Sequence, residues 1–132
     1  MDNLTNEQQK ELVDIFGELV IKKVRDSALK KGMAKATLKH TNPGKLKQYE
    51  CLKELPELQQ EAVCDLLSET ITSTIYDFIK LFEENASLLE MNIKKDGNVY
   101  DIIKISEEPG SDICFYENGW IQRFSEIGRF VL

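Results

Sequence analysis

The fold is decided first by residues 6–31, which read NEQQKELVDIFGELVIKKVRDSALKK. Apolar side chains recur there at steps of three and four residues, the period of one face of an α-helix: Leu12, Val13, Ile15, Phe16, Leu19, Val20, Val24, Ala28 and Leu29. The residues TNEQ at 5–8 fit a capping box, in which the side chains of Thr5 and Gln8 each bond the other's backbone N–H. We therefore expect a long amphipathic helix over about residues 6–31, ended or interrupted at Gly32 or just after it.

A second helical pattern begins at Pro56, which would occupy its first turn, and continues to about residue 85, where Asn-Ala-Ser suggests its end. Its apolar face consists of Leu58, Ala62, Val63, Leu66, Leu67, Ile71, Ile75, Phe78, Ile79 and Phe82. Between the two patterns, residues 41–44 (TNPG) form a turn signal, and a short helix is expected over 45–55. Two long amphipathic helices must cover each other or a shared layer.

The period changes to two after residue 87, and Asp96-Gly97 is a strong hairpin signal, so a β-hairpin is expected over about 88–105. Two registers are open. A two-residue turn pairs Met91 with Ile102, and a three-residue loop over 96–98 pairs Met91 with Ile103. We favour the longer loop, because register usually follows the buried face and this one groups five apolar side chains: Leu89, Met91, Ile93, Ile103 and Ile105.

The tail over 111–132 is rich in large apolar residues. Ser111 could cap a short helix and Gly119 could break it before Trp120, while a third strand is the alternative. The fold class expected from all these segments is α+β, in a single domain spanning residues 1–132.

Composition points to a folded protein of the cytoplasm. The chain has 132 residues, of which 42% are hydrophobic and 30% charged. No apolar run approaches the roughly 20 residues that span a bilayer, and the polar N-terminus lacks the features of a signal peptide. Cys51, Cys64 and Cys114 are odd in number and have no short spacing, which favours reduced, packed thiols over disulfides or a zinc site.

Motifs for catalysis are missing from the sequence. His40, the only histidine, lies among lysines beside a turn, and no G-x-S-x-G nucleophile elbow occurs. The carboxylate pairs at 83–84 and 107–108 fit solvated turns and helix ends better than an acid/base pair. No Gly-rich phosphate loop is present. We therefore predict no catalytic, cofactor or metal site, and no cofactor.

Charge is distributed unevenly along the chain. Residues 22–47 hold nine basic residues and one acid, a charge of +8 in a chain of net −6, so the remainder carries −14. Acids early and bases late in the first helix complement its dipole, and Glu18 and Lys22 are spaced for an ion pair. The bases left unexplained are Lys35, Lys39, Lys45 and Lys47. They either pair with the acidic remainder or form a contact site for a partner.

Three further side chains are candidates for a role. Trp120 and Phe124 are four residues apart and would cap the core, or Trp120 with Arg123 would form an exposed protein-interaction patch. An arginine is not needed for solubility among so many lysines. We therefore expect Arg25 to be partly buried and paired with a carboxylate from the tail or the second helix.

Three segments together resemble small bacterial proteins that have a helical N-terminal half, a Gly-Trp-Ile…Phe-Ser tail and no assigned activity. The segments are residues 16–18 with 24–26, residues 99–102 with 105–107, and residues 119–125 (GWIQRFS). Many small acidic bacterial proteins of this size resemble immunity proteins that neutralise toxins, or phage-associated regulators. The resemblance assigns a role to no residue of this chain.

The leading functional hypothesis is a non-enzymatic cytosolic protein-interaction protein, of the immunity or antitoxin kind, whose acidic surface would cover a basic toxin such as a nuclease. The alternative is a nucleic-acid-associated regulator that uses the basic segment 22–47. An enzyme without a recognisable motif is the third hypothesis. A homodimer is also open, and no membrane partner is expected.

Overall fold

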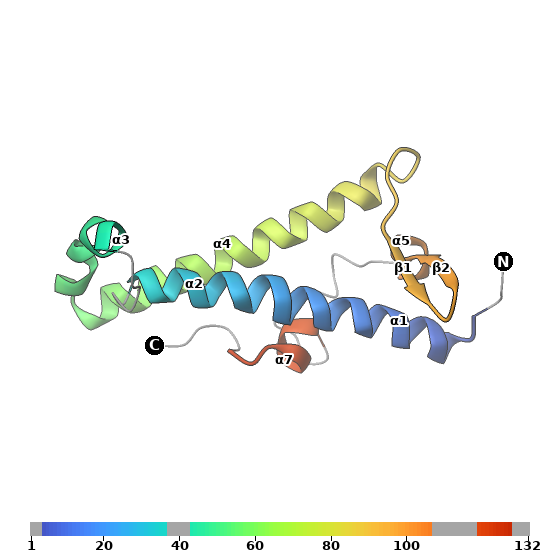
Figure 1. Cartoon of the computed structure of the whole chain (residues 1–132), viewed down its shortest axis with the longest axis horizontal. Helices are drawn as coiled ribbons and strands as arrows, with labels where there is room; N and C mark the ends of the chain where they lie inside the picture. The colour runs from blue at the N-terminus through green and yellow to red at the C-terminus, as the bar shows by residue number, and fades with distance from the viewer. Residues whose placement is uncertain (1–3, 37–42, 107–118, 128–132) are drawn as a thin grey trace.

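The longest element is a rod made of three successive helical segments. The computed structural model describes residues 4–36, 43–106 and 119–127, apart from the side chains of Lys45 and Leu46. The rod consists of α1 (Asn6–Leu19), a π-helical stretch η1 (Val20–Arg25) and α2 (Asp26–Ala36), and it runs along most of the molecule (Figure 1).

Local contacts explain where the rod begins and why it continues through Gly32. The capping box is confirmed: Thr5 N donates to Gln8 Oε1 at 2.9 Å and Gln8 N donates to Thr5 Oγ1 at 3.1 Å. At the other end the helix extends past the expected limit, because Gly32 is accommodated within α2 against the Leu67 side chain. A Cβ atom on Gly32 would lie 3.3 Å from Leu67 Cδ1, so glycine here permits close helix packing.

The second long helix, α4 (Glu57–Glu84), is confirmed and returns beside the rod. Pro56 occupies its N-cap, just before the first turn, and Asn85 ends it by donating from Nδ2 to the Leu81 carbonyl at 2.9 Å. The connection contains two short pieces in place of one helix, α3 (Pro43–Gln48) and a 3-10 helix η2 (Glu50–Glu54). In Figure 1, α4 lies close to α2 at one end of the molecule and diverges from α1 at the other.

A two-stranded antiparallel hairpin is present, so the α+β class is confirmed. Strands β1 (Asn92–Lys95) and β2 (Asn98–Asp101) pair Ile93 with Tyr100, which requires a two-residue turn. Asp96 and Gly97 have φ values of 53° and 80°, as a type I′ hairpin turn demands.

The three-residue loop favoured from the sequence is therefore wrong. The chain leaves the sheet at Asp101, whose side chain accepts from Ile103 N at 3.0 Å and so begins the short helix α5 (Ile102–Ile105). Because α5 turns, Ile102 becomes fully buried without belonging to a strand. The assumption that the apolar residues after Asp101 share one strand face caused the error.

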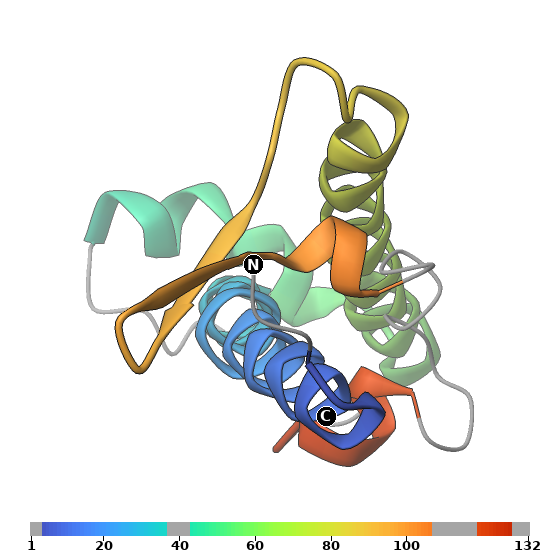
Figure 2. The ribbon, with the colours of Figure 1, turned by 90° about the vertical axis from the view of Figure 1, so that its right-hand side faces the viewer.

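Two buried clusters hold these elements to the rod, and Figure 2 shows the hairpin with α5 on one side of the rod and the C-terminal helix on another. One joins α1 to the hairpin and α5, through Leu12, Tyr100 and Ile102. The other joins the rod, α4 and the helix α7 (Trp120–Phe124), through Ile21, Ile79, Trp120 and Ile121. Phe16 packs against both clusters.

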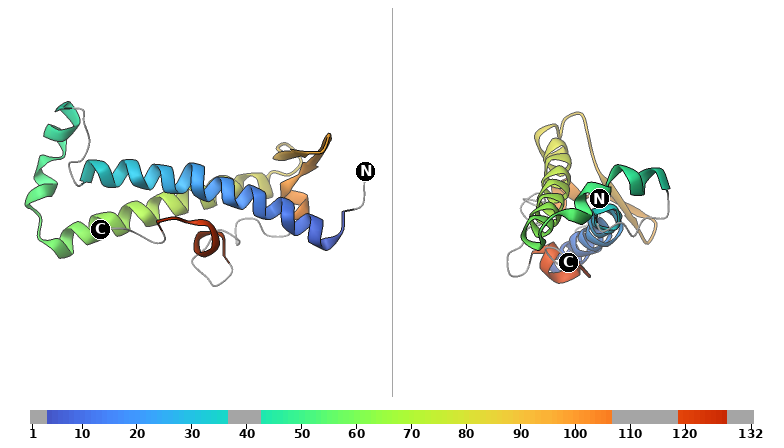
Figure 3. Two further views of the ribbon diagram at one scale, coloured as in Figure 1. Left: turned by 60° about the horizontal axis from the view of Figure 1, so that its bottom comes forward. Right: turned by 90° about the vertical axis from the view of Figure 1, so that its left-hand side faces the viewer.

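The tail helix α7 settles part of an open question. Over residues 119–127 the tail forms a short helix with Gly119 at its N-cap, followed by a bend, and not a third strand. Figure 3 shows α7 lying against the middle of the rod. The expected cap at Ser111 lies outside the described residues.

Candidate functional site

Arg25 is the most deeply buried charge in the described structure, with 0% of its surface exposed. Its guanidinium reaches α4 twice: Nη2 donates to Ser68 Oγ at 3.1 Å and Nε donates to Thr72 Oγ1 at 3.0 Å. Nη1 lies 3.2 Å from Asp26 Oδ1 and 3.2 Å from Ser125 Oγ in the tail. We call Arg25, Asp26, Ser68, Thr72 and Ser125 the Arg25 cluster.

Among the described residues, the carboxylate that pairs with Arg25 comes from its neighbour Asp26, and not from α4 or the described part of the tail as we expected. Those two elements supply hydroxyl groups and a backbone N–H instead. The Asp26 side chain accepts from Ser125 Oγ at 2.8 Å and from Glu126 N at 2.8 Å. Burial lowers the pKa of the Arg25 guanidinium, and the Asp26 charge opposes that shift.

The Arg25 cluster is suited to fastening and unsuited to catalysis. The hydroxyl groups of Ser68, Thr72 and Ser125 and the Glu126 N–H are hydrogen-bonded to the ion pair, so the buried charges are compensated. A buried arginine stays protonated and cannot act as an acid or a base near neutral pH. The cluster therefore joins the rod, α4 and the tail at one point.

Trp120 is part of the core and does not form the exposed patch that was one of its two expected roles. Only 1% of its surface is exposed, and its ring meets the Phe16 ring edge-on, with centroids 5.7 Å apart. Gly17 makes room for it: a Cβ on Gly17 would lie 2.5 Å from Trp120 Cε2. Arg123 Nη2 contacts Asp14 Oδ1 at 2.8 Å, which ties α7 to α1.

Four basic residues were not accounted for by the helix dipole, and the structure describes only some of them. Lys39 and the side chain of Lys45 lie outside the described residues. Lys35 is half-buried at the end of α2, and Lys47 is exposed on α3. Among the described residues neither of these two lysines forms an ion pair, whereas Glu18 and Lys22 do, at 2.8 Å. The described part of this segment thus gives no converging set of cations.

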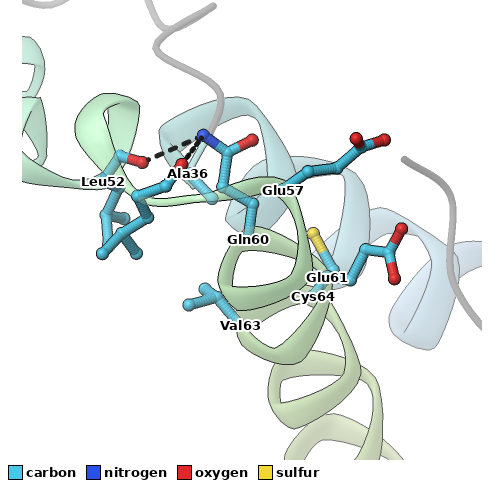
Figure 4. Close-up of a pocket in the computed structure, with 8 residues that line it drawn as sticks. Ala36, Leu52, Glu57, Gln60, Glu61, Val63 and Cys64 are labelled. Carbon is cyan, nitrogen blue, oxygen red and sulfur yellow. Dashed lines mark hydrogen bonds between the residues drawn. The ribbon is translucent and has the colours of Figure 1, made fainter.

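A cavity of about 450 Å³ lies where η2 meets α4. Gln60 fastens this corner, since its Nε2 donates to the carbonyls of Leu52 at 3.2 Å and Leu55 at 3.1 Å. In Figure 4 the carboxylates of Glu57 and Glu61 lie to one side of the cavity and the Leu52 side chain to the other.

A candidate nucleophile among the described residues that line this cavity is the Cys64 thiol. Cys64 lines it and is buried, and burial, followed by the charges of Asp65 and Glu61, raises the pKa of the thiol. A thiol with a raised pKa carries little thiolate near neutral pH and is a weak nucleophile. No histidine is among the described residues that line the cavity and could activate this thiol, and His40 lies outside the described residues.

A different kind of site lies where α1 and α4 diverge. It is a groove of about 380 Å³, which we call the apolar groove, lined by Phe16, Val20, Val24, Thr74, Ile75, Phe78, Ile79 and Met91. The Thr74 hydroxyl donates to the Thr70 carbonyl at 2.7 Å, so its polar atom is satisfied within α4. Every other side chain among the described lining residues is apolar.

The apolar groove is open to solvent. Val24 and Phe78 stand on its two walls and are 52% and 56% exposed. Leu81 on α4 is also exposed. Isolated apolar side chains on a surface are ordinary, but a contiguous exposed set within a concavity marks a binding surface. From the sequence the apolar lining residues were expected on the buried faces of the two helices and the hairpin, and not as a binding surface.

Comparison with known proteins adds no assignment: no family model, curated protein or solved structure matches the chain. Within the described ranges, no three His, Cys, Asp or Glu side chains are grouped so as to hold a metal ion. None of the described helices combines the length and the hydropathy that crossing a membrane requires.

Proposed function

We propose that the chain is a non-enzymatic protein-binding protein of the cytosol, which holds an apolar segment of a partner protein in the apolar groove. The observation that carries the proposal is the groove itself, walled by α1 with η1 on one side and by α4 on the other. Immunity proteins that neutralise a basic toxin are one form that this function would take.

The energetics of the groove favour occupation. Full burial of a Val or Phe side chain contributes about 1.5–3 kcal/mol, so half-exposed residues such as Val24 and Phe78 would each gain about half of that on binding. Phe16, Ile75 and Ile79 at the base already pack into the core, so the walls are held in place before a partner arrives. A preformed site loses less conformational entropy on binding.

The proposal is tested by photocrosslinking in extracts of the native host. Phe78→benzoylphenylalanine places a photoreactive ring on the groove wall. Leu66→benzoylphenylalanine is the matched control, because Leu66 is also on α4, is 64% exposed and lies outside the groove. We expect a discrete crosslinked protein from position 78 that is missing from position 66. Equal crosslinking at both positions, or none at position 78, would contradict the function.

A further inference from the structure

We propose that the occupant of the apolar groove is a basic amphipathic helix of a partner protein. This inference rests on the proposed function and narrows it to one kind of partner. It follows from three properties of the groove: the secondary structure of its walls, the charge of α4, and the poor fit of a second copy of this chain.

The walls favour a helical occupant. Both walls are helices whose backbone N–H and C=O groups are satisfied internally, and the carbonyl of the non-helical lining residue Met91 accepts from Ile102 N at 2.8 Å, so the described lining offers no strand edge. An extended segment would leave its own backbone groups unpaired there, whereas a helix satisfies them itself. Phe16, Val20 and Val24 follow each other at four-residue steps and form a row, against which the apolar stripe of a helix can pack.

The charge of α4 favours a basic occupant. This helix contains seven acidic residues and one lysine, a net charge of −6, equal to that of the whole chain. The lysine, Lys80, already pairs with Glu83 at 3.2 Å. Acids adjoin groove-lining residues in the sequence at Asp77, before Phe78, and at Glu90, before Met91, whereas a base, Lys23, adjoins Val24 on the opposite wall. Lys or Arg residues flanking an apolar stripe would meet these carboxylates.

A second copy of this chain fits less well. Two copies facing each other through the groove would bring together two α4 helices of net −6 each, and like charges oppose such contact. The basic segment η1 is itself a wall of the groove, and the basic helix α2 packs against its own α4 and has Leu29 fully buried. Its apolar face is therefore occupied and cannot enter the groove of another copy.

Two labelled peptides of about 18 residues, long enough for five helical turns, test the proposal. Both carry the same leucine stripe, one with lysine and the other with glutamate on the flanks. Fluorescence anisotropy with the full chain, at about 50 mM and about 500 mM salt, gives the dissociation constants. We expect the lysine peptide to bind at least about tenfold more tightly at low salt, and the difference to shrink at high salt.

The variants Phe78→Ser and Leu66→Ser complete the test. Phe78→Ser should weaken lysine-peptide binding by at least about tenfold, as loss of a central aromatic contact does, and Leu66→Ser should not. Equal affinity for both peptides, with loss in Phe78→Ser alone, would overturn the basic partner and leave the groove function intact. No binding of either peptide, or equal loss in both variants, would overturn both. Light scattering that shows a dimer lost in Phe78→Ser would make a second copy the occupant and overturn the proposal.

Discussion

Two neighbouring residues of the rod, Val24 and Arg25, lie in environments opposite to those that their side chains usually occupy. The charged Arg25 is fully buried, and the apolar Val24 is half exposed. Arg25 belongs to a hydrogen-bonded cluster that joins three elements, whereas Val24 lies on the wall of an open groove. One turn of helix therefore carries a residue with a structural role and a residue available for binding. The buried, hydrogen-bonded Arg25 fixes how the rod, α4 and the tail pack together, and the exposed Val24 is available to a partner.

The Arg25 cluster and the apolar groove also differ in what they specify. A hydrogen-bonded ion pair tolerates few geometries, so the Arg25 cluster fixes where α4 and the tail lie. Apolar contacts are non-directional, so the groove can accept any stripe of suitable size. Specificity at the groove must then come from the charges around it.

The largest effect is expected from breaking the Arg25 cluster. Arg25→Met leaves Asp26 buried without its counter-charge, and we expect the free energy of unfolding to fall by about 3–5 kcal/mol. The double variant Arg25→Met/Asp26→Leu removes both charges and should recover part of this loss. Urea denaturation followed by circular dichroism measures both. A double variant no more stable than Arg25→Met would show that the charge left on Asp26 is not the cause.

The contact between the rod and Trp120 should give the next largest effect. Gly17→Ala would put a methyl group 2.5 Å from the indole ring, and we expect it to destabilise the protein by about 1–3 kcal/mol, as overpacked cores do. Gly32→Ala is the matched control, because its methyl would lie 3.3 Å from the end of a flexible Leu67 side chain. The gain in helix propensity of about 1 kcal/mol is common to both changes. Equal shifts in Tm would contradict a tight contact at Gly17.

Thiol labelling probes the end of the molecule where α4 begins. In a Cys114→Ser background, Cys51 is exposed and Cys64 is buried, with its thiol pKa raised. A raised pKa leaves less thiolate at a given pH, so at neutral pH we expect iodoacetamide to modify Cys64 at least about tenfold more slowly than Cys51. The Cys64 rate should keep rising into the alkaline range. Mass spectrometry of the peptides gives both rates, and equal rates would mean that this end opens readily.

The smallest effect on folding is expected at the groove. Val24→Ser and Phe78→Ser remove side chains that are already half exposed, so each should change the free energy of unfolding by less than about 1 kcal/mol. The same denaturation assay measures these changes. A loss as large as that of Arg25→Met would mean that the groove walls hold the fold together, and the contrast between Val24 and Arg25 would fail.

Periodicity predicted the helices because their signals are local. The capping box at Thr5 and the end of α4 at Asn85 depend on side chains within a few residues. The hairpin register depended on where the chain leaves the sheet, and the cap made by Asp101 decided that. A preference for grouping apolar residues on one strand could not detect a helical turn at Ile102.

The candidate site was less predictable from sequence. Burial of Arg25 was expected from its isolation among lysines, but its partners Ser68 and Thr72 lie on another helix, and nothing in their spacing points to an arginine. The apolar groove exists because α1 and α4 diverge, and divergence is a property of tertiary packing. The sequence therefore predicts Phe78 as a core residue, whereas the divergence of the helices leaves it exposed.

The bond between Arg25 and Ser125 spans 100 residues, and this separation matters while the chain is being synthesised. At about 5–20 residues per second, Arg25 and Asp26 leave the ribosome several seconds before Ser125 does. The rod and α4 can pack together in that interval. The Arg25–Asp26 ion pair then still lacks its hydrogen bonds to Ser125. The hydrogen bonds around this ion pair can therefore be completed only after Ser125 has also left the ribosome.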